Sequence, residues 1–238
     1  MLQGRGQRRL GRRLVQLYIG LVIYGLSAAL LVRSRLGLDP WDVFHQGIAN
    51  HIGLAIGTVV IIVGAIVLLF WIPLRQWPGV GTVSNMIVIG VAMNFSLDAL
   101  PHVSAMPVRI AYMVVGILLT GVATGMYIGA NLGPGPRDGL MTGLSRRTGR
   151  SIRLVRTCIE VSVLVIGWTL GGVVGIGTVA FAVLIGPLAQ IFIPLFDTGA
   201  TRPRRQPAPA MWRTVRSRSR ILGVRRRIPA DAALPTQG

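Results

Sequence analysis

The sequence LGLDPWD at residues 36–42 returns as LGPGPRD at residues 132–138. Both segments follow the pattern Leu-Gly-x-x-Pro-x-Asp, and the second begins 96 residues after the first. The same offset relates GVGTV at residues 79–83 to GIGTV at residues 175–179, and it relates Gly47 to Gly143 and Gly53 to Gly149. Most of the matched residues are Gly, Pro, Thr or Asp rather than the abundant Leu, Val and Ile. This pattern indicates an internal duplication.

The composition excludes the usual soluble classes of protein. Of the 238 residues, 52% are hydrophobic and 13% are charged, and the mean hydropathy is +0.62. An ordinary soluble domain carries about 25% charged residues, and a chain this apolar buries enough surface to become ordered. The single cysteine, Cys158, excludes a disulfide framework and a cysteine-rich metal site.

Six apolar segments approach the ~20 residues that a helix needs to cross a bilayer. We therefore expect an all-α polytopic membrane protein with six transmembrane helices. The segment Asp39–Gly53 is too polar to cross lipid and predicts a short surface or re-entrant helix after the first span. The duplication predicts a second such helix after the fourth span. The predicted spans are Leu14–Val32, Ile56–Leu74, Val80–Leu100, Val108–Ala130, Leu154–Leu170 and Thr178–Phe196.

The positions of the arginines predict the orientation. All 25 basic residues are arginine, against seven acids, and the net charge is +18. If the N-terminus is cytoplasmic, 22 arginines lie on the cytoplasmic side and three, at positions 33, 35 and 109, lie outside. This division satisfies the positive-inside rule. It predicts cytoplasmic N- and C-termini and accounts for the positive charge without nucleic acid as a partner.

The spans divide the chain into four parts. These are a basic cytoplasmic N-terminus at residues 1–13, a first membrane repeat at residues 14–100, a second at residues 108–196, and a tail at residues 198–238. Each repeat holds three spans, an odd number, so the second repeat is expected to be inverted. Inverted repeats occur in secondary transporters that work by alternating access. The tail carries ten arginines, and we expect it to be disordered or to bind anionic lipids.

The paired Pro-x-Asp elements are the first candidate site. Pro40 and Pro136 suit the first position of a helix, and Asp42 and Asp138 then fall in its first turn. In one interpretation each Asp only caps its helix. In the alternative, each helix start is a substrate or cation site, with the Asp as ligand or gate.

Further candidates are the polar residues inside the spans. Asn94 and Gln190 lie at equivalent depths, where amides either bond between helices or line a polar path. Glu160 lies inside the fifth span, with Arg156 one turn earlier as its candidate partner. Gly64 is its counterpart in the first repeat. The pair is either an ion pair at the interface or a mark of the half that couples an ion.

A strip of glycines recurs every four residues along the fourth span and permits close helix packing, either within the monomer or in a homo-oligomer. The chain shows no metal-ligand spacing among its histidines, no P-loop and no nucleophile elbow. We therefore expect no metal, no cofactor and no enzymatic activity. The glycines of the strip are Gly121, Gly125, Gly129 and Gly133.

The run Leu132–Leu140, the loop Arg146–Ile152 that follows it and the Gly-x-Gly-Thr repeat resemble the YczE/YyaS/YitT family of bacterial integral membrane proteins. The resemblance extends over roughly residues 14–196. It is closest to the YczE branch, since YitT-type members carry a soluble C-terminal domain where this chain has an arginine-rich tail. The resemblance implies a multi-pass protein of the bacterial cytoplasmic membrane, and it brings no substrate or reaction.

The leading functional hypothesis is a transporter or permease that moves a small solute or ion by alternating access. The alternative is a non-transporting membrane scaffold or accessory protein that assists a partner membrane protein. Water-accessible polar residues at mid-membrane favour transport, whereas a dry core packed with glycines favours a scaffold. The expected partners are the lipid bilayer and, as open alternatives, a second copy or another membrane protein. The expected site residues are Pro40, Asp42, Pro136, Asp138, Asn94, Gln190 and Glu160.

Overall fold

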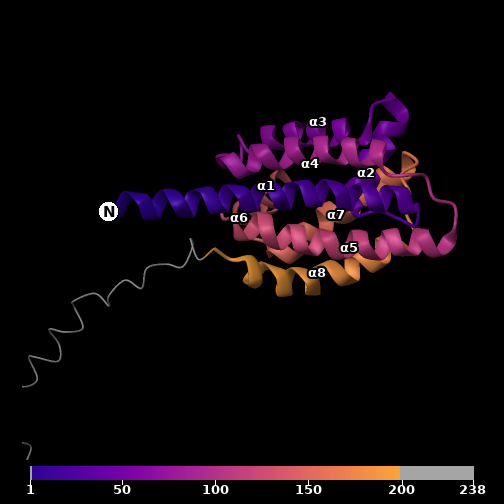
Figure 1. Ribbon diagram of the computed structural model, residues 1–238. Coiled ribbons are helices and arrows are strands. Elements are labelled where there is room, and N and C mark those ends of the chain that lie inside the picture. The colour runs from indigo at the N-terminus through magenta and orange to yellow at the C-terminus, as the bar shows by residue number, and fades with distance from the viewer. Residues whose placement is uncertain (1, 199–238) are drawn as a thin grey trace, which may run out of the picture. The chain divides into compact units, whose positions relative to one another are not determined.

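Eight helices make up the described part of the chain in the computed structural model, and this part contains no strand (Figure 1). The structure describes residues 2–198, with side chains from residue 10 onward, so the tail from residue 199 lies outside it. The predicted all-α class is confirmed. The helices are α1 (Leu2–Ser34), α2 (Pro40–Ile52), α3 (Ile56–Leu69), α4 (Val80–Ala99), α5 (Met106–Gly129), α6 (Pro136–Thr148), α7 (Ile152–Thr169) and α8 (Ile176–Phe196).

The helices α1–α4, here called the first half, correspond one by one to α5–α8, the second half. The starts of α2 and α6, of α3 and α7, and of α4 and α8 are each 96 residues apart. The local cause is the repeated pattern of helix-starting residues. Pro40 and Pro136 open α2 and α6, where a missing N–H costs nothing. Gly79 and Gly175 precede α4 and α8, and each donates its N–H to the Thr three residues later.

The long helices of the two halves lie side by side. Figure 1 shows α1 and α5 adjacent and running in opposite directions, with α4 against α1 and α8 against α5. In the first half α3 also packs against α4. The short helices α2 and α6 contact the other half, since α2 packs against α7 and α6 contacts α3. The two halves therefore contact each other through their short helices as well as through their long ones.

Four described helices are long and apolar enough to cross a membrane, and these are α4, α5, α8 and Leu10–Ser34 of α1. The helices α2 and α3 pass the same test only as a pair bent by 111°. The second span was predicted to reach Leu74, but its helix α3 ends at Leu69. With 14 residues, α3 is ~21 Å long. The predicted fifth span corresponds to α7. This helix carries Arg153, Arg156 and Glu160 and is therefore less apolar than α4, α5 and α8.

Two reciprocal hydrogen bonds join the halves where Leu-Gly ends a helix. The N–H of Gly81 donates to the carbonyl of Leu132 (3.0 Å), and the N–H of Gly177 donates to that of Leu36 (2.7 Å). At both sites the glycine after the Leu has a positive φ, 125° at Gly133 and 120° at Gly37. An L side chain rarely adopts such a backbone conformation. The repeated Leu-Gly thus places the start of α4 or α8 against the opposite half.

The glycines of α5 bring α8 close. A Cβ atom at Gly121 would lie 2.8 Å from the Leu188 Cβ, and one at Gly125 would lie 2.7 Å from the Phe192 backbone. Gly129 faces the Phe196 backbone in the same way. The strip therefore packs within the monomer. Gly133 lies beyond it, against the start of α4.

Candidate functional site

The start of α2 buries two carboxylates. The Asp39 Oδ1 accepts hydrogen bonds from the N–H groups of Trp41 (2.8 Å) and Asp42 (3.0 Å) and so caps the helix. The Asp42 Oδ1 lies 3.1 Å from the His45 Nδ1, one turn further on. Asp39 and Asp42 are 4% and 2% exposed. Capping is therefore the role of Asp39, and the Asp42 side chain is left for other contacts.

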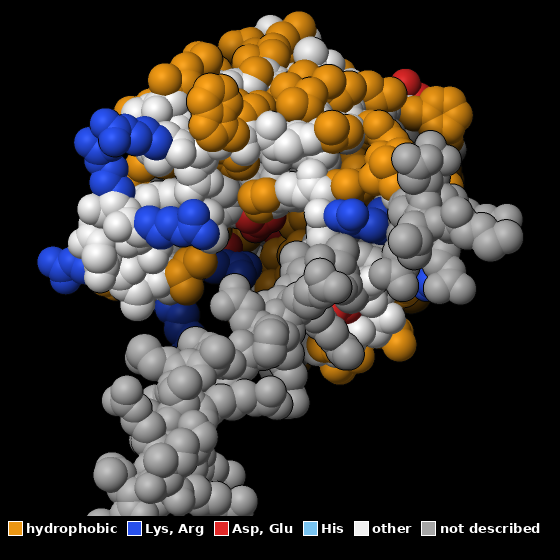
Figure 2. Space-filling view, turned by 90° about the vertical axis from the view of Figure 1, so that its left-hand side faces the viewer, with side chains coloured by type: hydrophobic (Ala, Val, Ile, Leu, Met, Phe, Trp, Pro, Cys, Tyr) orange, Lys and Arg blue, Asp and Glu red, His pale blue; other side chains and the backbone are white. Residues whose placement is uncertain are grey.

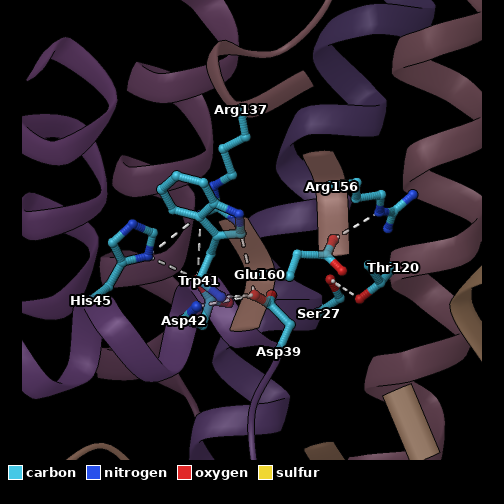
Figure 3. Close-up of polar contacts among 9 residues, drawn as sticks. All are labelled: Ser27, Asp39, Trp41, Asp42, His45, Thr120, Arg137, Arg156 and Glu160. Carbon is cyan, nitrogen blue, oxygen red and sulfur yellow. Dashed lines mark hydrogen bonds and ion pairs between the residues drawn. The ribbon is translucent and has the colours of Figure 1, made fainter. Parts of the chain in front are cut away.

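Arg137, the second residue of α6, reaches the start of α2 (Figure 3). Its guanidinium nitrogens lie 3.9 Å from the Asp39 Oδ1 and 3.6 Å from the Asp42 Oδ1. One of them also lies 3.4 Å from the His45 Nδ1. The two Pro-x-Asp elements, predicted as paired features, are therefore joined by an arginine that belongs to one of them.

The same guanidinium lies over an aromatic ring. The Arg137 Cζ is 5.0 Å from the centroid of the Trp41 ring, within the range of a cation–π interaction. Trp41 and Arg137 are themselves 96 residues apart and hold the same place in the two repeated motifs. The contact is thus made by two equivalent positions, where the halves meet.

Asp138 is held on the α6 side of this contact. The Tyr127 hydroxyl donates to the Asp138 Oδ2 over 2.8 Å, and the Trp71 Nε1 donates to the Pro136 carbonyl over 3.1 Å. Gly139 faces the Trp71 ring so closely that no Cβ atom fits there. These contacts fix the start of α6 against the segment that follows α3.

Two cavities adjoin the Trp41–Arg137 contact. Apart from the residues that they share, the first, of about 80 Å³, is lined mainly by α3 and α4, and the second, of about 180 Å³, is lined mainly by α2, α5, α7 and α8. Ten of the 15 residues around the first cavity have their counterpart, 96 residues away, around the second. Both cavities also share five lining residues, namely Tyr24, Trp41, Tyr127, Arg137 and Asp138. They are equivalent spaces of different size.

One ion pair lines the second cavity and has no counterpart around the first. The Arg156 Nε donates to the Glu160 Oε1 over 2.8 Å, and both side chains line the cavity. Their counterparts around the first cavity are Val60 and Gly64. The partner predicted for Glu160 is therefore its partner in the structure, and the pair faces the cavity together with Asp39.

The second cavity opens toward the end of the molecule where α1 begins. It shares Ile128, Asp138, Met141 and Arg156 with a wider groove lined by Pro134 and Arg153. Figure 2 shows this face hollowed near its centre, with acidic side chains at depth and arginines around the hollow. Pro134 is exposed, whereas its counterpart Leu38 is buried.

At the other end of the molecule, α2 and the residues just before it are bonded to the segment after α7. The Leu38 N–H donates to the Val173 carbonyl (3.3 Å), and the Gln46 Oε1 accepts from the Val173 N–H (2.7 Å). The Asn50 Nδ2 donates to the Gly171 carbonyl (3.1 Å). These bonds hold α2 against the segment after α7, as the Trp71–Pro136 bond holds α6 against the segment after α3.

Three predicted site residues line neither cavity, namely Asp42, which contacts Arg137, and the two amides Asn94 and Gln190. The Asn94 Oδ1 accepts from the Gly57 N–H (2.8 Å), and its Nδ2 donates to the Thr58 Oγ1 (3.1 Å), so this amide binds the start of α3. Gln190 is exposed on α8. Pro40, Asp138 and Glu160 line the second cavity, and Pro136 and Asp138 line the first.

Sequence reasoning did not assign Trp41, Arg137 and His45 to the site, although the structure places them at its centre. A signal was present, because Trp41 and Arg137 stand at one of the three positions where the two copies of the motif differ. A position at which the two copies differ is a position at which the two halves can have different roles. Among the described residues, no three His, Cys, Asp or Glu side chains are grouped so as to hold a metal ion.

Comparison with known proteins places the chain in a family. The model of a family of unknown function, DUF6198, matches residues 11–194. A protein of Haemophilus influenzae titled "Uncharacterized protein" is 42% identical over 177 residues, which are 74% of this chain and 81% of the relative. The uncharacterized membrane protein YczE of Bacillus subtilis is 36% identical over 179 residues, 74% of this chain and 83% of YczE.

A third relative, YyaS of Bacillus subtilis, is 25% identical over 183 residues, 75% of this chain and 91% of YyaS. No solved structure matches the chain. The resemblance to YczE and YyaS that the Leu-Gly-x-x-Pro-x-Asp motif predicted is confirmed. Together with the long apolar helices, these matches show an integral membrane protein, and the chain belongs to the DUF6198 family.

Proposed function

We propose that this protein is a transporter of a small solute that works by alternating access between two inverted halves. The proposal also includes six membrane crossings and cytoplasmic termini. Two of the crossings are bent and consist of α2 with α3 and of α6 with α7. The observation that carries it is the pair of equivalent cavities, of about 80 and 180 Å³, on either side of one central contact. In inverted-repeat transporters the two halves exchange conformations around a fixed site.

The asymmetry between the halves supports this function. In the first half α3 packs against α4, whereas α7 and α8 stand apart and both line the second cavity. If the halves exchanged conformations, the first cavity would widen and the second would narrow. The open end carries Arg146, Arg147 and Arg153 near its rim, which by the positive-inside rule is the cytoplasmic end. This conformation is therefore the inward-open one of the proposed cycle.

The test is the accessibility of two equivalent cavity positions. Ile89 lines the first cavity, and Ile185, its counterpart, lines the second. Ile89→Cys and Ile185→Cys are made separately in a Cys158→Ala background and treated with a membrane-impermeant thiol reagent. We expect Ile185→Cys to react in inside-out vesicles and Ile89→Cys to react in intact cells. Val91→Cys, on the exposed face of α4, is the lipid-facing control and should react from neither side.

A cross-link then tests whether the two accessibilities are coupled. Leu38→Cys and Val173→Cys place a cysteine on each side of the contact between the start of α2 and the segment after α7, and they are bridged before labelling. The bridge should abolish labelling at Ile89→Cys from outside and leave labelling at Ile185→Cys from inside. If both positions react from the same side, or if Ile89→Cys never reacts, alternating access is wrong. The scaffold or accessory role would then stand in its place.

A further inference from the structure

We propose that the transported or bound solute is a small organic cation, an ammonium or guanidinium compound, which displaces Arg137 from Trp41. This proposal rests on the proposed function for its transport step, but its binding step stands by itself. The observation behind it is that Arg137 already occupies a site built for a cation. One aromatic face and two buried carboxylates surround its guanidinium, and these are the groups that recognise organic cations.

Arg137 is held loosely in that site. Its nitrogens lie 3.9 and 3.6 Å from the two carboxylate oxygens, whereas a charge-assisted hydrogen bond is ~2.7–2.9 Å long. The Asp42 Oδ2 and the Trp41 Nε1 are buried, and neither has a hydrogen-bond partner among the described residues. Buried polar atoms without a partner cost free energy. The site is therefore incompletely satisfied by its own arginine.

The charge around the contact selects a cation over an anion. Arg137 faces Asp39 and Asp42 directly, and Asp138 lines the second cavity beside Arg137 and Asp39. Arg156 is already paired with Glu160. One guanidinium thus stands among three carboxyl groups, so an entering cation gains from the excess of acids. The same acids would repel an entering anion.

The size and lining of the second cavity limit the solute. A space of about 180 Å³ is below the ~300–1,000 Å³ of sites for drug-sized ligands. Tyr24, Tyr127 and Phe181 line it beside Trp41. Aromatic walls with a carboxylate at one side suit a compact cation with methyl or methylene groups. Methylguanidinium and tetramethylammonium have this character and serve as probes.

Displacement of Arg137 also connects binding with movement. The guanidinium is the group that joins the start of α6 to the start of α2. A solute cation on Trp41 would satisfy the same carboxylates and release Arg137 from α2. The contact between the halves would then open only when the site is filled. This is the differential interaction that a ligand needs in order to shift a conformational equilibrium.

Binding is tested on the purified full-length protein in nanodiscs, by isothermal titration with methylguanidinium, tetramethylammonium and, as the anionic probe, acetate. We expect both cations to bind and acetate not to bind. Asp42→Asn and Trp41→Leu should weaken cation binding by about tenfold or more, because a carboxylate or the aromatic face is lost. Trp41→Phe should retain most of the affinity. Trp77→Leu, at an exposed position outside the cavities, is the matched control and should bind as the parent does.

Arg137→Gln gives the decisive comparison. If Arg137 competes with the solute, its removal should tighten binding of methylguanidinium by about tenfold. If Arg137 itself holds an anionic solute, the same variant should abolish acetate binding. Binding of acetate alone, or equal cation affinity in Trp41→Leu and Trp77→Leu, overturns the proposal even if Arg137→Gln does not fold. Accessibility that alternates without cation binding would leave transport standing and reject only this solute class.

Discussion

The side chains of Trp41 and Arg137 contact each other, with the guanidinium carbon 5.0 Å from the ring centroid, although 96 residues separate them in the chain. They hold the same place in the two repeated motifs. Equivalent positions of the two motifs thus contact each other directly. At such a place, identical residues would meet as like against like, and two tryptophans or two arginines could not form this interaction. The divergence of the motif at this position therefore creates the contact.

The cap and the charge of Asp39 can be separated by substitution. Asp39→Ala removes the acceptor for the N–H groups of Trp41 and Asp42 and should lower the free energy of unfolding by about 1 kcal/mol. Asp39→Asn keeps a capping oxygen and should leave stability nearly unchanged. Both variants lose the negative charge beside Arg137 and should bind organic cations less tightly. Thermal unfolding in detergent and titration measure the two effects, and equal stability of both variants would contradict the capping role.

The left-handed glycines at the joined helix ends should resist substitution. Gly133→Ala places a Cβ atom 2.9 Å from the Thr82 Oγ1 at a φ of 125°. We expect a loss of about 1–3 kcal/mol from the strained backbone. Gly11→Ala is the control, because a Cβ atom there meets open space inside α1. Thermal unfolding should show a lower midpoint for Gly133→Ala alone, and a parent-like midpoint would argue against the reciprocal joint.

The contact between α5 and α8 depends on the glycine strip. Gly125→Ala places a Cβ atom 2.7 Å from backbone atoms of Phe192, which cannot move as a flexible side chain would. The helices must separate, and we expect a lower unfolding temperature and loss of buried contact along α8. Gly186→Ala, with open space around its Cβ position, should have no such effect. Thermal unfolding of the two variants measures the difference, and equal midpoints in Gly125→Ala and Gly186→Ala would contradict this role of the strip.

The two amides predicted as equivalent should behave differently. Asn94→Leu removes the acceptor for the Gly57 N–H and the donor to Thr58, so it should destabilise the fold by about 1–3 kcal/mol. Gln190→Leu, at an exposed position on α8, should leave stability unchanged within about 0.5 kcal/mol. Neither substitution should alter cation binding by the folded protein. A loss of binding in folded Gln190→Leu would place this residue in the site after all.

Much of this architecture was accessible from residue patterns. The helical class, the four helices that are long and apolar enough to cross a membrane and the offset between helix starts follow from apolar length and from repeated Pro and Gly. These features depend on local chemistry, namely which backbone groups can bond and which conformations a residue can adopt. The family assignment also followed from a local motif. The second span was overestimated, because apolar residues continue to Leu74 after the helix has ended at Leu69.

The site was decided by tertiary structure. In the sequence, Arg137 is one of many arginines, and nothing gives His45 a partner. Asn94 and Gln190 have the same predicted depth in their spans. Only the packing of α6 against the first half brings Arg137 to Asp39, Asp42 and Trp41. Only the packing of α3 on α4 turns Asn94 inward, while α8 exposes Gln190. Local patterns determine where helices begin, but which side chains share a cavity depends on how distant helices pack.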